Sequence, residues 1–106
     1  MYNLFNNSNI NKQSNYGIQN NTNNFETLQK ARQDLMGEIE AVMQYDSHIH
    51  NSTDRFAIET WENIKNEELT HVGELLGLIN YLDPSQQQFI QDGLNEFNKR
   101  ISGNNQ

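Results

Sequence analysis

The sequence predicts an all-α fold, in which two long helices form an antiparallel hairpin and a short third helix follows. Apolar residues recur in alternating steps of three and four from Leu28 to Leu82, which keeps them on one face of a helix. No segment has the strict apolar–polar alternation of a strand. Because a chain of 106 residues builds a marginal core alone, we expect two hairpins to pair in a dimer as a four-helix bundle.

The first 24 residues differ in composition from the rest of the chain. Ten of them are Asn, and Lys12 is their one charged residue. They have no helical or strand periodicity, so we expect residues 1–24 to form a disordered tail. Residues 102–106, "SGNNQ", are expected to fray, which leaves residues 25–101 for the helical domain.

Charge and composition exclude several classes of partner and chemistry. The net charge of -7 repels nucleic acid phosphates and anionic membrane surfaces, so cations are the more natural ligands. The absence of Cys excludes disulfides and thiolate metal sites and suits a cytoplasmic protein. No stretch approaches the roughly 20 apolar residues that span a bilayer, and no secretory signal is evident.

The first long helix carries a carboxylate in its apolar row. The row consists of Leu28, Ala31, Leu35, Glu38, Val42, Tyr45 and Ile49. The following segment, "HNSTD", supplies turn chemistry, and Ser52, Thr53 or Asp54 is expected to cap the next helix. This short turn makes the two helices antiparallel.

Two polar residues, Glu68 and His71, interrupt the apolar row of the second long helix. Its row consists of Ala57, Trp61, Ile64, Glu68, His71, Leu75, Leu78 and Leu82. Asp83 is then placed to cap a third helix, and Pro84 suits that helix's first position. The apolar face of the third helix consists of Ile90, Leu94, Phe97 and Ile101.

The register of the hairpin brings the three polar residues of these rows, Glu38, Glu68 and His71, close together. Glu38 lies about 13 residues before the turn and Glu68 about 16 after it, a mismatch of about one helical turn, so they lie at a similar depth. Glu68 and His71, at i and i+3, share a face. Neither row contains Lys or Arg, so a metal ion is the expected counter-charge. Imidazole with carboxylates favours iron or manganese, with zinc as the next choice.

A dimer would complete a site for two metal ions. Two copies of Glu38, Glu68 and His71 supply four carboxylates and two imidazoles. This is the ligand set of di-iron carboxylate bundles, and four carboxylates balance two ferrous ions in charge.

Two segments resemble the encapsulated ferritins, a ferritin-like family whose chains contain half of a four-helix bundle. These segments are "LMGEIEAVMQYD" (residues 35–46) and "NEELTH" (residues 66–71). The resemblance implies a di-iron ferroxidase centre with two ions per dimer, in which Glu38, Glu68 and His71 bind the metal. It also implies that Tyr45 lies beside the iron and that Glu40 is an acidic residue on the path by which iron enters.

The resemblance further implies partners. In this family the third helix packs against the partner subunit, and dimers assemble into rings that are cargo of encapsulin shells. We therefore expect a ring of dimers in the cytoplasm, inside an encapsulin nanocompartment if a shell protein is the partner. The C-terminal "RISGNNQ" differs from the apolar, Gly-containing peptide by which such cargo docks.

Several of these residues also have a purely structural interpretation. Tyr45 and Trp61 also suit core packing, and Glu40 suits a solvated surface. His48 and His50 lie near the turn, and we expect them to be exposed. The predicted function is a ferroxidase that oxidises ferrous to ferric iron, for iron storage or detoxification. Two alternatives stay open: a rubrerythrin-like peroxide scavenger with the same site, and a non-catalytic helical oligomer.

Overall fold

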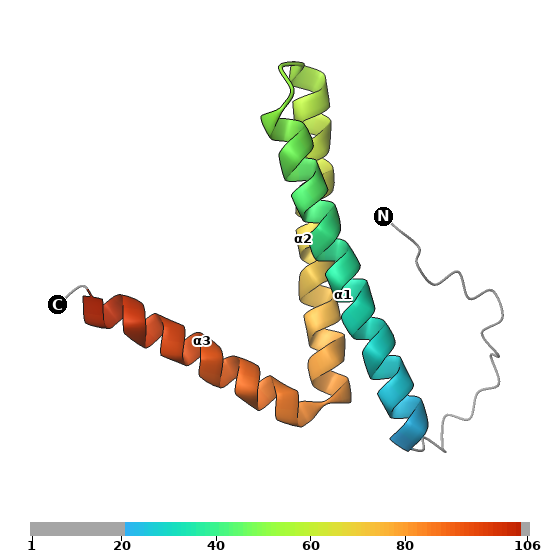
Figure 1. Cartoon of the computed structure of the whole chain (residues 1–106), viewed down its shortest axis with the longest axis vertical. Helices are drawn as coiled ribbons and strands as arrows, with labels where there is room; N and C mark the ends of the chain where they lie inside the picture. The colour runs from blue at the N-terminus through green and yellow to red at the C-terminus, as the bar shows by residue number, and fades with distance from the viewer. Residues whose placement is uncertain (1–20, 105–106) are drawn as a thin grey trace.

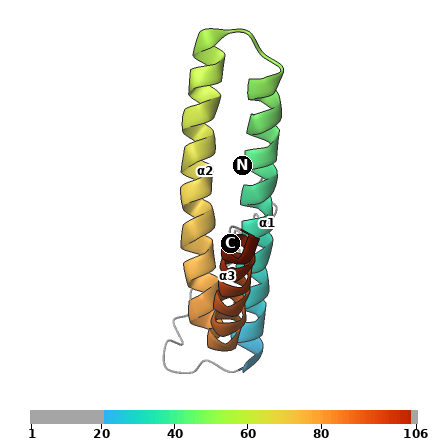
Figure 2. The same cartoon turned by 90° about the vertical axis from the view of Figure 1, so that its left-hand side faces the viewer.

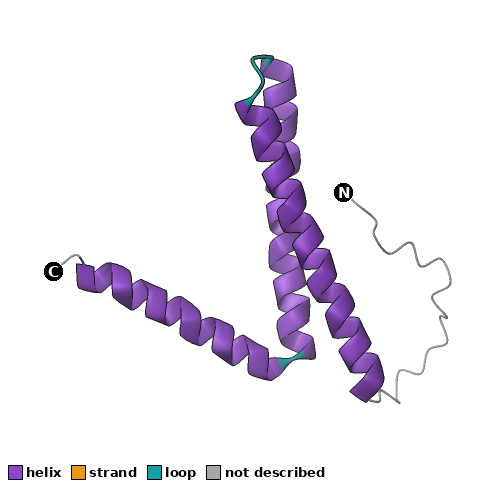
Figure 3. Cartoon of the chain, viewed as in Figure 1, coloured by secondary structure: helices purple, strands orange, loops and turns teal. Residues whose placement is uncertain are grey.

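The computed structural model describes residues 21–104, and helices make up almost all of this range. Its elements are α1 (Asn21–His50), α2 (Arg55–Leu82) and α3 (Pro84–Asn104). Figure 3 shows the three helices joined by two short connections. The part of the chain that the structure describes contains no strand, which confirms the all-α prediction.

The helix bounds differ from the predicted domain bounds at both ends. α1 begins at Asn21 rather than at residue 25, and α3 continues to Asn104 rather than ending at residue 101. α3 has 21 residues and is therefore not a short helix. Adding a residue to an existing helix is much easier than starting one, so weak helix formers extend both ends. The rest of the predicted tail, residues 1–20, lies outside the described residues, as do residues 105–106.

The turn between α1 and α2 is held by side chains at its two ends. Asp54 is the N-cap of α2, and its carboxylate accepts a hydrogen bond of 2.8 Å from the backbone N–H of Ala57. On the other side, the Asn51 amide donates to the backbone carbonyl of Ser47 at 3.0 Å. The prediction of a cap in this segment is confirmed, with Asp54 as the capping residue. The short connection lays α2 back along α1 as an antiparallel hairpin (Figure 1).

A single residue, Asp83, joins α2 to α3. Its backbone N–H donates to the carbonyl of Ile79 at 2.9 Å, which ends α2. Its carboxylate accepts from the backbone N–H of Gln86 at 3.3 Å and from the Ser85 hydroxyl at 2.7 Å, which caps α3. Pro84 is the first residue of α3, as predicted. α3 therefore begins at the end of the hairpin opposite the turn (Figure 1).

The described chain is one helix pair with a projecting arm. Figure 2 shows α1 and α2 side by side, and Figure 1 shows α3 pointing away from the pair rather than folding back on it. The structure measures 52 × 45 × 14 Å along its three principal axes. The shortest is the width of one helix pair, because helix axes pack about 8–10 Å apart and Cα atoms lie about 2.3 Å from each axis. A stable domain usually has a second layer, and no described helix of this chain supplies one.

The core is correspondingly thin. Among the described residues, the fully buried apolar side chains are Ala31, Ala41 and Ile79. Ala31 belongs to the predicted row, whereas Ala41 and Ile79 do not, and Leu78 from the second row is exposed. Many large apolar side chains face solvent: Phe25, Met36, Ile39, Met43, Phe56, Leu69, Leu78, Tyr81, Phe89, Leu94, Phe97 and Ile101. None of the described helices is both long enough and apolar enough to cross a membrane.

Candidate metal centre

Three side chains with metal-binding atoms converge within the hairpin. Glu38 comes from α1, and Glu68 and His71 come from α2. Each offers one ligand atom, and these atoms all lie within 4.8 Å of one another. Glu68 and His71 share a face of α2 because they are three residues apart, and the antiparallel register brings Glu38 to the same depth. The structure thus brings together the three residues that the sequence singled out.

The two carboxylates are buried, whereas the imidazole lies at the edge of the group. Glu38 is 4% exposed and Glu68 is 6% exposed. The His71 side chain is 42% exposed. The group is therefore enclosed by the hairpin on the carboxylate side and reaches solvent beside His71.

Several buried atoms of this group have no hydrogen-bond partner. They are one oxygen of each carboxylate, Glu38 Oε2 and Glu68 Oε2, and the Nδ1 atom of His71. His71 Nδ1 lies 3.5 Å from Oε1 of Glu38 and 3.5 Å from Oε1 of Glu68. A buried polar group without a partner costs about 1–3 kcal/mol, and more when it is charged. The metal-free group is therefore destabilising.

Among the described residues, no Lys or Arg forms an ion pair with either carboxylate. Within residues 21–104, the ion pairs of Lys and Arg join Lys65 to Asp46, Arg55 to Glu59 and Arg32 to Asp83. None of these pairs includes Glu38 or Glu68. The one basic group beside the carboxylates is the imidazole of His71, which is charged only when protonated.

Burial and charge repulsion raise the pKa of Glu38. Burial is the largest cause, because it disfavours the charged form, and the neighbouring Glu68 carboxylate raises this pKa further. His71 acts in the opposite direction but does not reverse the shift. The position thus favours a bound positive charge, which either a proton or a metal ion can provide.

The geometry and the donor types fit a transition-metal ion. Two oxygen donors and one imidazole nitrogen suit iron, manganese or zinc better than calcium or magnesium, which prefer oxygen donors alone. Donors bound to one ion at about 2.1 Å lie at most about 4.2 Å apart. The observed spread of 4.8 Å therefore needs only a small side-chain movement to close around an ion. Three donors leave further coordination positions open.

The other residues predicted for the site lie outside the group of three. Tyr45 is half-buried on α1, two turns closer to the hairpin turn than Glu38, and Glu40 is exposed. The exposure predicted for His48 and His50 is confirmed.

Sequence reasoning missed that the ring of His48 packs against other rings near the turn. Its centroid lies 5.0 Å from that of Trp61, which is half-buried, and 6.2 Å from that of Tyr45. His48 comes from α1 and Trp61 from α2, so this contact depends on the relative rotation of the two helices.

No protein-family model, curated protein or solved structure matches this chain. The Glu38, Glu68 and His71 group can bind a metal ion.

Proposed function

We propose that the protein is a non-haem di-iron ferroxidase, which oxidises ferrous to ferric iron at a centre shared by two copies of the chain. Its role would be iron storage or detoxification. One observation carries the proposal: two buried carboxylates and an imidazole face one another without partners for their inner atoms. The resemblance to encapsulated ferritins specifies iron among the metals that fit.

One chain supplies too few ligands for two metal ions, which supports a shared centre. Two copies of Glu38, Glu68 and His71 bring four carboxylates and two imidazoles, the set found in di-iron carboxylate bundles. The exposure of His71 leaves a side of the group through which a second copy can approach. The second helix pair would also supply the missing layer of the four-helix bundle.

The exposed apolar side chains supply a further reason for pairing. Phe89, Leu94, Phe97 and Ile101 are all exposed on α3, whose backbone packs against that of α2 and whose first turn meets α1 through the Arg32 side chain. Most of the stability of a helix in a protein comes from packing its apolar face, so a partner surface would stabilise α3. In the family that the sequence resembles, the third helix packs against the partner subunit. A ring of dimers, with an encapsulin shell as partner, is proposed from that resemblance alone.

Each side chain of the proposed centre would have its own role. The Glu38 and Glu68 carboxylates would hold the metal ions, and Glu38 would release any proton that its raised pKa retains when an ion binds. His71 would bind through Nδ1, the ring nitrogen that faces both carboxylates. Bound ferrous ions would supply the electrons that reduce dioxygen or peroxide.

Tyr45 would act beside the centre rather than as a ligand, as an electron donor or hydrogen-bond partner. Its seven-residue separation from Glu38 corresponds to about 10 Å along the helix. Glu40 would assist the entrance of iron from the exposed surface.

Anaerobic titration with ferrous iron tests the proposal directly. We expect about one ion to bind per chain, with dimer formation in sedimentation velocity, and a ferric absorbance band to appear when oxygen is admitted. Glu68→Ala should abolish the iron binding, the iron-induced dimerisation and the ferric band. The matched control is Glu67→Ala, which removes the adjacent but exposed carboxylate. Equal iron binding and oxidation by both variants would refute the proposal.

A non-catalytic helical oligomer is the second candidate, because the exposed apolar side chains favour assembly with or without metal. This candidate predicts the same oligomer in the presence of a chelator and no oxidation of added iron. A rubrerythrin-like peroxide scavenger would instead oxidise iron with peroxide much faster than with dioxygen. The titration separates the three functions when it is repeated with each oxidant.

A further inference from the structure

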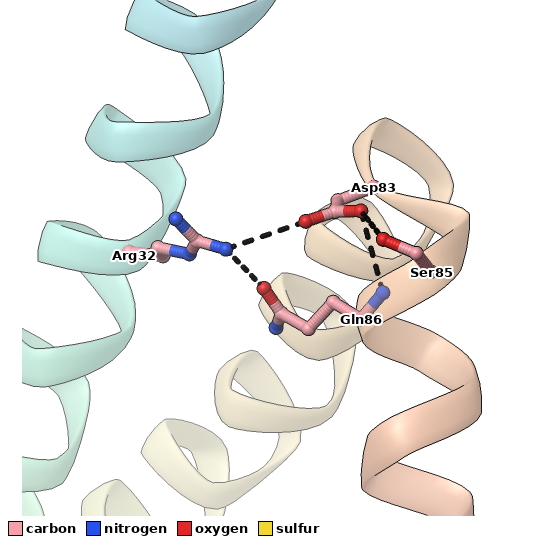
Figure 4. A network of polar contacts seen from close by, with 4 residues as sticks. All are labelled: Arg32, Asp83, Ser85 and Gln86. Carbon is pink, nitrogen blue, oxygen red and sulfur yellow. Dashed lines mark hydrogen bonds and ion pairs between the residues drawn. The ribbon is translucent and has the colours of Figure 1, made fainter.

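A polar network links α1 to the junction between α2 and α3. The guanidinium of Arg32, on α1, donates a hydrogen bond to the side-chain carbonyl of Gln86 in the first turn of α3. The same Nη2 atom lies 3.5 Å from Oδ2 of Asp83, the residue that joins the two helices. Figure 4 shows Arg32 reaching across from α1 to both acceptors. One side chain of the hairpin thus holds both the junction and the start of the arm.

The two carboxylate oxygens of Asp83 contact residues of different helices. Oδ1 caps α3, where it accepts from the Gln86 N–H and the Ser85 hydroxyl. Oδ2 faces Arg32. These hydrogen bonds and the Arg32 guanidinium hold the pKa of Asp83 below its usual value, so the carboxylate is charged at neutral pH. The cap of α3 and the link to α1 therefore act through one rigid group.

The direction of α3 depends on this junction because little else restrains the helix. Every residue from Gln91 to Gly103 is exposed, so none of the outer part of the arm is buried against the hairpin. The 21 residues of α3 span about 30 Å. A rotation of roughly 10° at Asp83 would displace the far end by about 5 Å, which is one helical turn. A small change at the junction would thus move the apolar face of α3 out of register with any partner.

We propose that Arg32 is a positioning residue that fixes the direction of α3, and thereby sets whether the apolar face of α3 reaches a second copy of this chain. The guanidinium suits this role because it is always charged and because its Nη2 atom faces acceptors from both elements, the Gln86 carbonyl and the Asp83 carboxylate. The inference rests on the proposed pairing of two chains but not on metal binding.

Distances between spin labels on the hairpin and on α3 test this positioning. The chain has no Cys, so Asn66→Cys on α2 and Lys99→Cys on α3, both at exposed positions, would carry the two labels. Labelled protein is diluted into unlabelled protein, so that the measured distance lies within one chain. We expect one narrow distribution when Arg32 is present and a broad one in Arg32→Met, with unchanged helix content by circular dichroism.

Two further variants separate positioning from general stability. Asp83→Asn keeps a capping oxygen for α3 but removes the charge opposite Arg32, so it should broaden the distribution as well. Arg55→Met is the matched control, because the Arg55 guanidinium pairs with Glu59 on the same helix and should leave the distribution narrow.

Dimer affinity provides the second measurement. We expect sedimentation equilibrium to give a dimer dissociation constant roughly tenfold higher for Arg32→Met, the loss typical of a charge-assisted hydrogen bond. A distribution that stays equally narrow in Arg32→Met and Asp83→Asn would overturn the inference. A chain with Arg32 that never dimerises, with or without iron, would instead refute the proposed pairing, while the intrachain distances still decide the role of Arg32 in directing α3.

Discussion

Replacing Glu38 with Gln should stabilise the metal-free protein. The amide has nearly the same shape as the carboxylate, so Glu38→Gln leaves no cavity, but it removes a buried charge with one oxygen that has no partner. Such an uncompensated group destabilises by about 1–3 kcal/mol, so the free energy of unfolding should rise by about that amount at neutral pH. For a domain of this size, each kcal/mol raises Tm by about 4–8 °C. Thermal unfolding in a chelator, at one fixed protein concentration, measures the change.

The size of this stabilisation should depend on pH. The pKa of Glu38 is raised above its ordinary value of 4.5, so the folded chain holds this proton more tightly than the unfolded chain. The stability that Glu38 contributes is therefore fully present below pH 4.5 and is lost as the pH rises through the raised pKa. The advantage of Glu38→Gln should accordingly vanish below pH 4.5 and grow above it.

Metal should offset the stability advantage of Glu38→Gln over the parent protein. At a free metal concentration of about 100 times Kd, binding stabilises the folded state by about 2.7 kcal/mol. Anaerobic ferrous iron or manganese should stabilise the parent protein by this amount and leave Glu38→Gln unchanged. Glu40→Gln is the control, because the exposed Glu40 side chain should change stability by less than about 0.5 kcal/mol in either condition. If Glu38→Gln destabilises the metal-free protein at neutral pH, Glu38 has a partner in solution and the reasoning fails.

Three further predictions concern the site and the core. His71→Ala should weaken manganese binding, measured by calorimetry, by at least about tenfold, since losing even an outer contact of a metal site has that effect; His48→Ala should not. Ile79→Ala should lower the free energy of unfolding in urea by about 2–5 kcal/mol and Ile79→Val by about 0.5–1.5 kcal/mol, because this side chain is fully buried; equal effects would show that Ile79 is not in a packed core. Trp61, the one Trp of the chain, lies two helical turns from Glu68, so bound cobalt should quench its fluorescence, and the quenching should disappear in His71→Ala.

The sequence predicts the convergence of Glu38, Glu68 and His71 because two periodicities constrain these residues together. Within α2, Glu68 and His71 share a face whatever the helix packs against. Across the hairpin, the short turn sets the depth at which Glu38 meets them. Both relations depend only on helix geometry and turn length, so they can be deduced without knowledge of side-chain packing.

Features that depend on the rotation of one helix against another could not be deduced in this way. The two long helices pack along their length only against each other among the described helices, so only a narrow line of residues is buried, and Ala41 and Ile79 lie on it in place of members of the predicted rows. The contact of His48 with Trp61 and the link from Arg32 to Asp83 are of the same kind. Each joins residues whose proximity depends on an interhelical rotation that periodicity does not define.

The proposed shared centre would link metal binding to assembly. Buried carboxylates without partners destabilise the metal-free hairpin, and exposed apolar side chains destabilise the single chain in water. If a centre shared by two chains removes both unfavourable features, metal binding and dimerisation are reciprocally coupled. An ion that raises the dimer affinity by a given factor then binds more tightly to the dimer than to the monomer by that same factor. Metal affinity should therefore rise with protein concentration until dimerisation is complete. A metal affinity that is independent of protein concentration, over a range in which the dimer forms, would place the metal centre within one chain.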